Sequence, residues 1–64
     1  MFNYTEEELN KLSPEWRNAL IDIDHNNLSY KEHAFKYGLT VGTVKSRMHR
    51  VRAKVRQIRE QNVA

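Results

Sequence analysis

The sequence has no cysteine, and this absence excludes several kinds of small domain. A 64-residue chain without cysteine has no disulfide framework, no zinc-finger ligand set and no thiol nucleophile. A chain this short buries only about 60% of the surface that its unfolded form exposes, so its core is small. The length excludes a Rossmann fold, a TIM barrel and any large catalytic cleft. We expect a single domain over residues 1–64.

Proline, glycine and long apolar runs are also scarce. One proline and two glycines, with 39% hydrophobic and 30% charged residues, favour a compact helical domain over a disordered tail. No apolar run approaches the roughly 20 residues of a membrane span. The acidic start at Glu6–Glu8 is also wrong for a signal peptide. We therefore expect an intracellular, cytoplasmic protein with no membrane contact.

Charge is distributed unevenly along the chain. Residues 1–40 carry four basic and seven acidic side chains, a net charge of −3. Residues 41–64 carry seven basic side chains and one acidic side chain, a net charge of +6. A basic stripe on one element is the electrostatic footprint expected for a polyanionic partner. The alternative is that these basic side chains form an ordinary solvated helix surface and bind no partner.

Capping signals divide the chain into about four helices, and strand signals are weak. Each predicted helix start has a side chain suited to the N-cap position, and these are Thr5, Ser13, Ser29 and Thr40. Glu8 and Glu32 complete two capping boxes, and Pro14 stands at a first helical position. The predicted helices cover about 6–11, 14–24, 30–37 and 41–60.

Two breaks in the helical pattern set the expected topology. Asn26–Asn27 ends the second helix, because asparagine tolerates the left-handed conformation. Gly38 is the natural residue just past the third helix, and Leu39 is expected to point inward. The third helix, this turn and the basic fourth helix form a helix-turn-helix unit. We predict an all-α fold with a C-terminal helix-turn-helix and a long basic recognition helix.

The fourth predicted helix has an apolar stripe, which we interpret as core. Its members fall at helical spacing and are Val44, Met48, Val51, Val55 and Ile58. The stripe continues past the part that the motif needs. Phe2, Tyr4 and Leu9 can fold back onto it, or it can form a short coiled coil or a partner interface. We prefer the intramolecular interpretation and a monomer, because so short a heptad stretch is weak support for dimerisation.

The segment Val41–Arg50, which reads VGTVKSRMHR, is close to the recognition-helix sequence of a known family. Leu28–Tyr30 matches the start of the preceding helix, and Leu12 and Pro14 match the helix before that. Over residues 12–52 the chain resembles region 4 of bacterial sigma factors of the extracytoplasmic-function type. Regulators of the LuxR type share the architecture, but the end of the segment fits sigma factors better.

This resemblance implies a role in transcription. In the family, the domain binds the −35 promoter element and contacts the flap of RNA polymerase. The expected partners are therefore double-stranded DNA and the RNA polymerase core, and the length suits a small standalone phage or mobile-element relative. The domain that melts the −10 element has no counterpart in these 64 residues, so we expect no promoter opening by this chain alone.

Two alternatives remain open. The first is a protein-interaction module that grips the polymerase flap or an anti-sigma factor, with weak or no DNA binding. Its contacts would come from the apolar stripe with Leu20, Ile23 and Phe35. The second is the DNA-binding part of a phage packaging protein. Salt-dependent binding of promoter DNA without polymerase separates the DNA-binding interpretation from the first alternative.

The chain departs from the family pattern in the middle of the motif. Members usually have aliphatic residues where this chain has His25 and His33, and a glycine where Asn27 stands. Phe35 and Lys36 are exchanged in character relative to the usual pattern. These departures fall in the second and third predicted helices and the segment between them.

No catalytic or metal-binding pattern stands out. The spacings of His25, His33 and His49 match no familiar ligand set, so we expect partly buried neutral histidines and no metal. The acidic residues form no convincing catalytic pair, and most lie near helix starts, where they complement the helix dipole. We therefore expect no enzyme and no cofactor.

The predicted DNA-binding residues lie mostly on the outward face of the fourth helix. They are Arg17, Thr40, Gly42, Thr43, Lys45, Ser46, Arg47, His49, Arg50 and Arg52. Gly42 lets the backbone approach a phosphate, and the two threonines add hydroxyl contacts. The residues expected to reach base edges are Lys45, Ser46, His49 and Arg50. Arg17, Arg47 and Arg52 are expected at phosphates, whereas Lys54, Arg56 and Arg59 are expected only to solvate the helix. Trp16 and Tyr30 are interpreted as core or interface aromatics.

Overall fold

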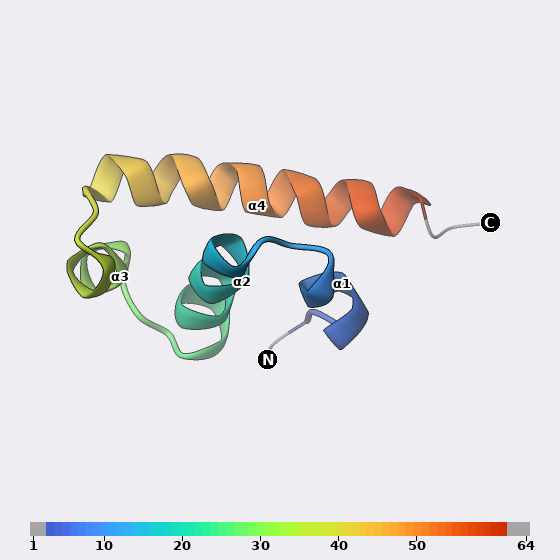
Figure 1. Ribbon diagram of the computed structural model, residues 1–64, viewed down its shortest axis with the longest axis horizontal. Helices are drawn as coiled ribbons and strands as arrows, with labels where there is room; N and C mark the ends of the chain where they lie inside the picture. The colour runs from blue at the N-terminus through green and yellow to red at the C-terminus, as the bar shows by residue number, and fades with distance from the viewer. Residues whose placement is uncertain (1–2, 62–64) are drawn as a thin grey trace.

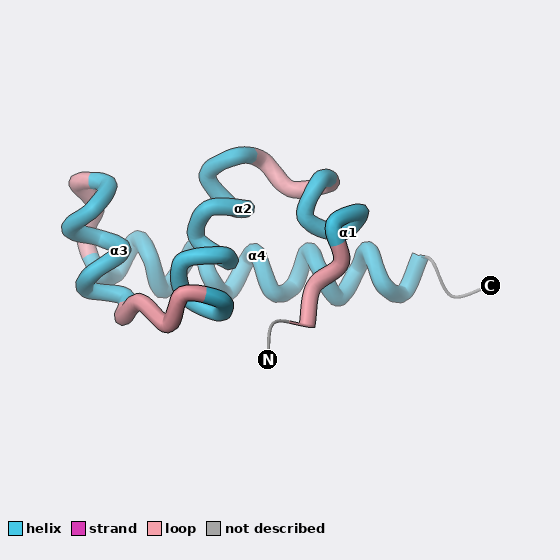
Figure 2. Tube along the Cα trace, turned by 90° about the horizontal axis from the view of Figure 1, so that it is seen from below, coloured by secondary structure: helices cyan, strands magenta, loops and turns pink. Residues whose placement is uncertain are grey.

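One long helix organises the molecule, and the shorter helices pack along one side of it. The computed structural model describes residues 3–61. Its elements are α1 (Glu6–Asn10), α2 (Pro14–Leu20), the π-helical turn η1 (Ile21–His25), α3 (Tyr30–Tyr37) and α4 (Val41–Gln61). Figure 1 shows α4 running the length of the molecule with α3, α2 and α1 below it, and Figure 2 shows the same row from beneath. The predicted all-α fold is confirmed, with no strand in the described part of the chain.

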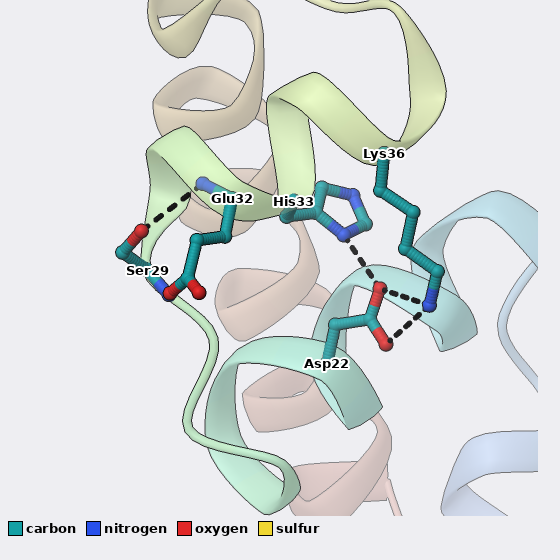
Figure 3. Close-up of polar contacts among 5 residues, drawn as sticks. All are labelled: Asp22, Ser29, Glu32, His33 and Lys36. Atoms are coloured by element: carbon teal, nitrogen blue, oxygen red, sulfur yellow. Dashed lines mark hydrogen bonds and ion pairs between the residues drawn. The ribbon is translucent and has the colours of Figure 1, made fainter.

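All four predicted helix starts are capped by the expected side chains. The oxygen of each cap accepts from the backbone N–H three residues further on, and the caps are Thr5, Ser13, Ser29 and Thr40. In the two capping boxes, Glu8 and Glu32 also accept from the backbone N–H of the capping residue, at 2.9 and 2.8 Å. Figure 3 shows the Ser29–Glu32 contact. Local hydrogen bonds thus fix where each helix begins.

The second predicted helix changes geometry before its end. Residues 14–24 were expected to form one α-helix, but α2 ends at Leu20 and the chain continues as the π-helical turn η1. The backbone N–H of Asn26 donates to the carbonyl oxygen of Ile21 at 2.9 Å, a bond across five residues rather than four. Asn27 then takes a φ of 60°, the left-handed conformation expected at this break.

The apolar stripe of α4 is the centre of the core. None of its five residues is more than 3% exposed. They are buried with Leu12, Ala19, Leu20 and Ala34, and the half-buried Tyr4, Leu9 and Leu39 pack against this cluster. The predicted fold-back of the N-terminal residues is confirmed for Tyr4 and Leu9, whereas Phe2 lies outside the described residues. The stripe is therefore covered by the chain itself and is not available to a partner.

The other apolar residues named for a partner interface are divided between core and surface. Leu20 is fully buried and Ile23 is half-buried, but Phe35 is 90% exposed on α3. Its neighbour Lys36 contacts Asp22 of η1 instead, with Nζ 3.2 Å from Oδ1. None of the described helices combines the length and apolar character that a membrane crossing requires.

A buried polar cluster joins η1 to α3 (Figure 3). Nδ1 of His33 lies 2.8 Å from Oδ2 of Asp22, and Nζ of Lys36 lies 3.2 Å from Oδ1. Burial would raise the pKa of Asp22, but the hydrogen bonds from His33 and Lys36 outweigh it and hold the pKa below its ordinary value. His33 is 1% exposed, and its Nε2 has no hydrogen-bond partner. The cluster places an ionised carboxylate between two helices.

The expectation of partly buried histidines is only partly right. His33 is buried, but His25 and His49 are exposed, because His25 ends η1 and His49 lies on the outer side of α4. Within residues 3–61, no group of three or more histidine and acidic side chains has the arrangement of a metal site. The histidines therefore do not act as one set.

A second ion pair fastens α1 to the end of α4. Nε of Arg59 lies 2.7 Å from Oε2 of Glu8, and the same guanidinium donates to the carbonyl oxygen of Asn3. Arg59 was expected only to solvate the helix, and this expectation is wrong. The hydrogen bond from Arg59, with that from the Thr5 backbone, lowers the pKa of Glu8 from 4.5 to about 2. The pair ties the two ends of the described chain together.

Replacing Glu8 with glutamine tests this pair, because glutamine keeps the capping box and removes the charge. An ion pair with one half-exposed partner is worth on the order of 1 kcal/mol, which corresponds to about 4–8 °C in Tm for a protein of this size. The folded pKa lies below the unfolded one, so the stabilisation is complete above pH 4.5 and is lost as the pH falls toward about 2. Urea unfolding at a series of pH values from 7 to 2 measures this effect. The difference in the free energy of unfolding between the wild type and Glu8→Gln should decrease as the pH falls from 4.5 to about 2.

The matched control for that measurement is Glu7→Gln. Glu7 is exposed, and its distance to Lys11 is 4.0 Å, so its substitution should change the free energy of unfolding little. The difference in the free energy of unfolding between the wild type and Glu8→Gln could instead be the same at pH 2 and pH 7. That result would show that the charge of Glu8 does not stabilise the fold.

Candidate nucleic-acid interface

The predicted helix-turn-helix unit is formed by α3, the turn at residues 38–40 and α4. Gly38 has a φ of 68°, and the N–H of Leu39 donates to the carbonyl oxygen of Ala34 at 2.8 Å, which ends α3. Figure 1 shows α3 nearly end-on while α4 runs across the view, so the two helices cross steeply. Val41, Gly42 and Thr43 are all exposed. The turn thus presents the first turn of α4 at one end of the molecule.

A hollow lies along one flank of α4 and is named here the Trp16 hollow. Its volume is about 630 Å³, and it is lined by Trp16, Thr40, Gly42, Thr43, Ser46, Arg47 and Arg50. Six of these seven residues belong to the predicted DNA-binding set. The remaining one, Trp16, comes from α2 and forms the wall opposite α4. Hydroxyl groups and two guanidinium groups make this flank suitable for a phosphate backbone.

A second hollow lies along the other flank and is named the Tyr30 hollow. Its volume is about 400 Å³, and it is lined by Tyr30, Lys45, His49, Arg52, Ala53 and Arg56. Tyr30 begins α3 and is half-buried, so it forms the wall on that side. Three basic side chains and one histidine line this flank. Its composition is therefore also that of an anion-binding surface.

Small residues form the outermost ridge of α4 and border the hollows: Gly42 and Ser46 line the Trp16 hollow, and Ala53 lines the Tyr30 hollow. Gly42, Ser46 and Ala53 are all exposed there. A Cβ atom built on Gly42 meets nothing within 4 Å, so this part of the helix faces open space. A helix whose outer ridge is small and whose flanks are basic can approach base edges closely while long side chains reach both phosphate strands.

Thr40 and Thr43, two of the predicted DNA-binding residues, hydrogen-bond to each other at the start of α4. The hydroxyl of Thr40 accepts from the backbone N–H of Thr43 at 3.1 Å and donates to the hydroxyl of Thr43 at 2.9 Å. The proton of the Thr43 hydroxyl can still be donated to a phosphate oxygen. The hydroxyls are thus oriented at the exposed helix start, where the dipole favours an anion.

Arg52 already has partners within the protein. Its Nη2 lies 3.0 Å from Oδ1 of Asp24, and its Nη1 donates to the hydroxyl of Tyr30 at 3.3 Å. Burial would lower the pKa of Arg52, but these contacts outweigh it and raise the pKa. Arg52 is therefore charged and oriented at the edge of the Tyr30 hollow.

Arg17 is the one predicted DNA-binding residue that lies in neither hollow. It is half-buried, and its guanidinium donates to the carbonyl oxygens of Leu9 and Leu12 at 3.1 and 3.3 Å. These carbonyls lie at and just beyond the end of α1, so Arg17 stabilises the connection from α1 to α2. The structure brings the other nine predicted residues together along α4.

Sequence reasoning left out four residues that line the hollows, one of which is the small outer residue Ala53. Trp16 and Tyr30 were interpreted only as core or interface aromatics, and Arg56 as a solvating charge. The helical spacing from Arg52 to Arg56 is the signal that could have found Arg56, because residues four apart share a face. No local signal could have found the two aromatics, since they come from other helices.

Comparison with known proteins agrees with this arrangement. Residues 2–55 match the family described as sigma-70, region 4. The chain is also 44% identical over 48 residues to the ECF RNA polymerase sigma factor SigE of Mycolicibacterium smegmatis. That match covers 75% of this chain but 19% of the relative, so the chain spans about one fifth of that protein's length. No solved structure matches the chain significantly.

The family match identifies the helix-turn-helix unit. Region 4 is the part of a sigma factor that typically binds the −35 element in bacterial transcription initiation, and it is a non-enzymatic domain. The matched relative is bacterial, and the comparisons lend no support to a phage source. Because the match extends over most of the sequence, the chain belongs to the sigma-70 region 4 family.

Proposed function

We propose that this chain binds the −35 element of a bacterial promoter through the major groove. The observation that carries the proposal is the pair of basic hollows on either side of the small outer ridge of α4. The major groove is about 12 Å wide and admits one α-helix, so its two phosphate strands lie beside the two flanks of that helix. Each hollow then receives one strand, and the ridge approaches the bases.

The side chains divide into two groups on this proposal. Arg47 and Arg52 lie toward the inner edges of the hollows and bind phosphates. Ser46, His49 and Arg50 lie closer to the outer ridge and reach base edges. Phosphate contacts set affinity and position, whereas base contacts set the preferred sequence.

Membership of the family suggests where the chain acts and which second partner it has. We infer that the chain acts in the bacterial cytoplasm as a single, monomeric, non-enzymatic domain, with the RNA polymerase core as a second partner. The alternative, a protein-interaction module with weak DNA binding, is favoured by the exposure of Phe35. Its other proposed anchors are buried or half-buried, however, so DNA binding is the stronger proposal.

Titration of labelled duplexes with the protein tests this function. One duplex is selected by the protein from a random library, and the other is a scrambled duplex of the same composition. We expect preferential binding of the selected duplex, with an affinity that falls linearly in log–log form as the salt concentration rises. Binding of neither duplex at low salt, by a protein that is folded by circular dichroism, would contradict the proposal.

Replacing Arg50 or Arg47 with alanine should separate the two kinds of contact. A base-reading arginine is worth about 1–3 kcal/mol of discrimination, so Arg50→Ala should reduce the preference for the selected duplex. Arg47→Ala should weaken both duplexes alike and lower the log–log salt slope by about one. The same titrations at several salt concentrations measure both effects. The opposite result for the two variants would mean that α4 is rotated differently in the groove.

A further inference from the structure

Asp24 holds one of the proposed phosphate-binding groups, the guanidinium of Arg52, in an ion pair at the protein surface. Its Oδ1 accepts from Nη2 of Arg52 at 3.0 Å, and the side chains are 22% and 45% exposed. The pair therefore lies at the boundary between the core and the Tyr30 hollow. A guanidinium paired with a carboxylate has fewer free donors and a smaller local field to offer a phosphate.

The carboxylate itself is anchored from the opposite side. The hydroxyl of Tyr4 donates to Oδ2 of Asp24 at 2.8 Å, and Tyr4 packs against the core. Asp24 is thus held between the N-terminal segment and α4. If a phosphate draws Arg52 outward, Asp24 does not follow, and the ion pair must break.

Arg52 differs in this respect from its basic neighbours. Within residues 3–61, Lys45 and Arg56 form no ion pair with a carboxylate, although they line the same hollow. These two charges are free to attract any DNA, whatever its sequence. The charge of Arg52 is available only when something competes successfully with Asp24.

We propose that Asp24 is a specificity-determining residue, which restrains Arg52 until α4 is seated on its preferred DNA sequence. The inference rests on the proposed function. On the preferred duplex, base contacts fix α4 in the groove and bring a phosphate close enough to displace Asp24. On other sequences the helix is not fixed in this way, and Arg52 stays paired. Withholding a favourable contact from the wrong partner is a general route to specificity.

The test replaces Asp24 with asparagine, which keeps an oxygen acceptor for Arg52 and removes the charge. The selected and scrambled duplexes are titrated by fluorescence anisotropy over a series of sodium chloride concentrations. In the wild type, we expect the log–log salt slope to be larger by about one on the selected duplex. Asp24→Asn should bind the scrambled duplex roughly fivefold more tightly, and the two slopes should become equal.

Three controls separate this role from a purely structural one. Glu7→Gln removes one negative charge from an exposed position that lines neither hollow, and it should leave both slopes unchanged. Asp24→Asn combined with Arg52→Ala should show no gain on the scrambled duplex, because the released charge is absent. Arg52→Ala alone should lower the slope on the selected duplex only, a test that does not depend on the folding of any Asp24 variant.

The outcomes distinguish this inference from the proposed function. If the wild type binds neither duplex, the proposed function fails and the restraint fails with it. If the wild type shows salt-dependent, selective binding but Asp24→Asn leaves both slopes unchanged, only the restraint is wrong. Equal weakening of both duplexes by Asp24→Asn, or equal loss of slope on both duplexes in Arg52→Ala, would also overturn it.

Discussion

Replacing Asp22 with alanine is expected to lower the free energy of unfolding by about 3–5 kcal/mol and to unfold most of the protein at 25 °C. Asp22 is the acceptor for the buried ring of His33 and for the amine of Lys36. Without it, Nδ1 of His33 is left unpaired in the core, where Nε2 already has no partner. A protein of this length has only about that much stability in total.

Removal of the whole buried pair should be far less harmful than removal of one partner. In Asp22→Leu combined with His33→Ile, no unpaired polar group remains, and apolar side chains fill the same space. Replacement of a buried ion pair by well-packed apolar residues is often neutral or stabilising. The resemblance to the sigma family also places an aliphatic residue at position 33. We therefore expect the double variant to be folded and more stable than Asp22→Ala.

Urea unfolding followed by circular dichroism measures all of these variants. Lys31→Ala, an exposed change in the same helix α3, is the control and should alter stability by less than about 0.5 kcal/mol. A double variant as unstable as Asp22→Ala would contradict this account. It would show that Asp22→Ala is unstable because the hydrogen bonds between η1 and α3 are lost, and not because a polar group is left unpaired in the core.

Replacing Gly42 with glutamate is expected to reduce DNA affinity at least about a hundredfold without unfolding the protein. A Cβ at this position meets nothing within 4 Å, so the larger side chain fits without strain. Glutamate is also a better helix former than glycine and is favourable in the first turn of a helix. Its carboxylate would stand at the Trp16 hollow, where the proposed function brings a DNA strand, and facing like charges cost several kcal/mol.

The matched controls for Gly42→Glu are glutamine and alanine at the same position. Glutamine has the same size without the charge, so the difference between the two variants isolates the electrostatic effect. Alanine should leave affinity nearly unchanged. Circular dichroism and duplex titration are performed on the same samples. Unchanged affinity in a folded Gly42→Glu protein would mean that the outer ridge of α4 does not face DNA.

Much of the fold follows from signals that act over three or four residues. Thr5 with Glu8 and Ser29 with Glu32 satisfy orphan N–H groups locally, so the helix starts could be predicted without knowledge of any neighbour. Gly38 fixes the end of α3 in the same way, because its left-handed conformation costs it little. The apolar stripe of α4 is likewise a property of helical periodicity, and it became the core.

The basic character of the site was equally visible in the sequence. Nine of the ten predicted DNA-binding residues line the two hollows. Eight of them share the continuous helix α4 and Thr40 caps it, so charge and spacing along one element were enough to group them. Arg17 lies outside this helix, and its contacts with the carbonyl oxygens of Leu9 and Leu12 depend on how α1 meets α2.

The contacts between groups far apart in the sequence were decided only by the tertiary structure. Glu8 and Arg59 are separated by 51 positions, and Asp24 and Arg52 by 28. Their pairing depends on the angles at which helices cross α4, and capping and periodicity do not specify these angles. The burial of His33 against Asp22, and the walls that Trp16 and Tyr30 give to the hollows, have the same origin. The sequence by itself determined where the helices lie and which face of α4 is basic, because those are local properties. The packing of η1 and α1 determined which basic side chains of α4 are paired, because it places Asp24 beside Arg52 and Glu8 beside Arg59.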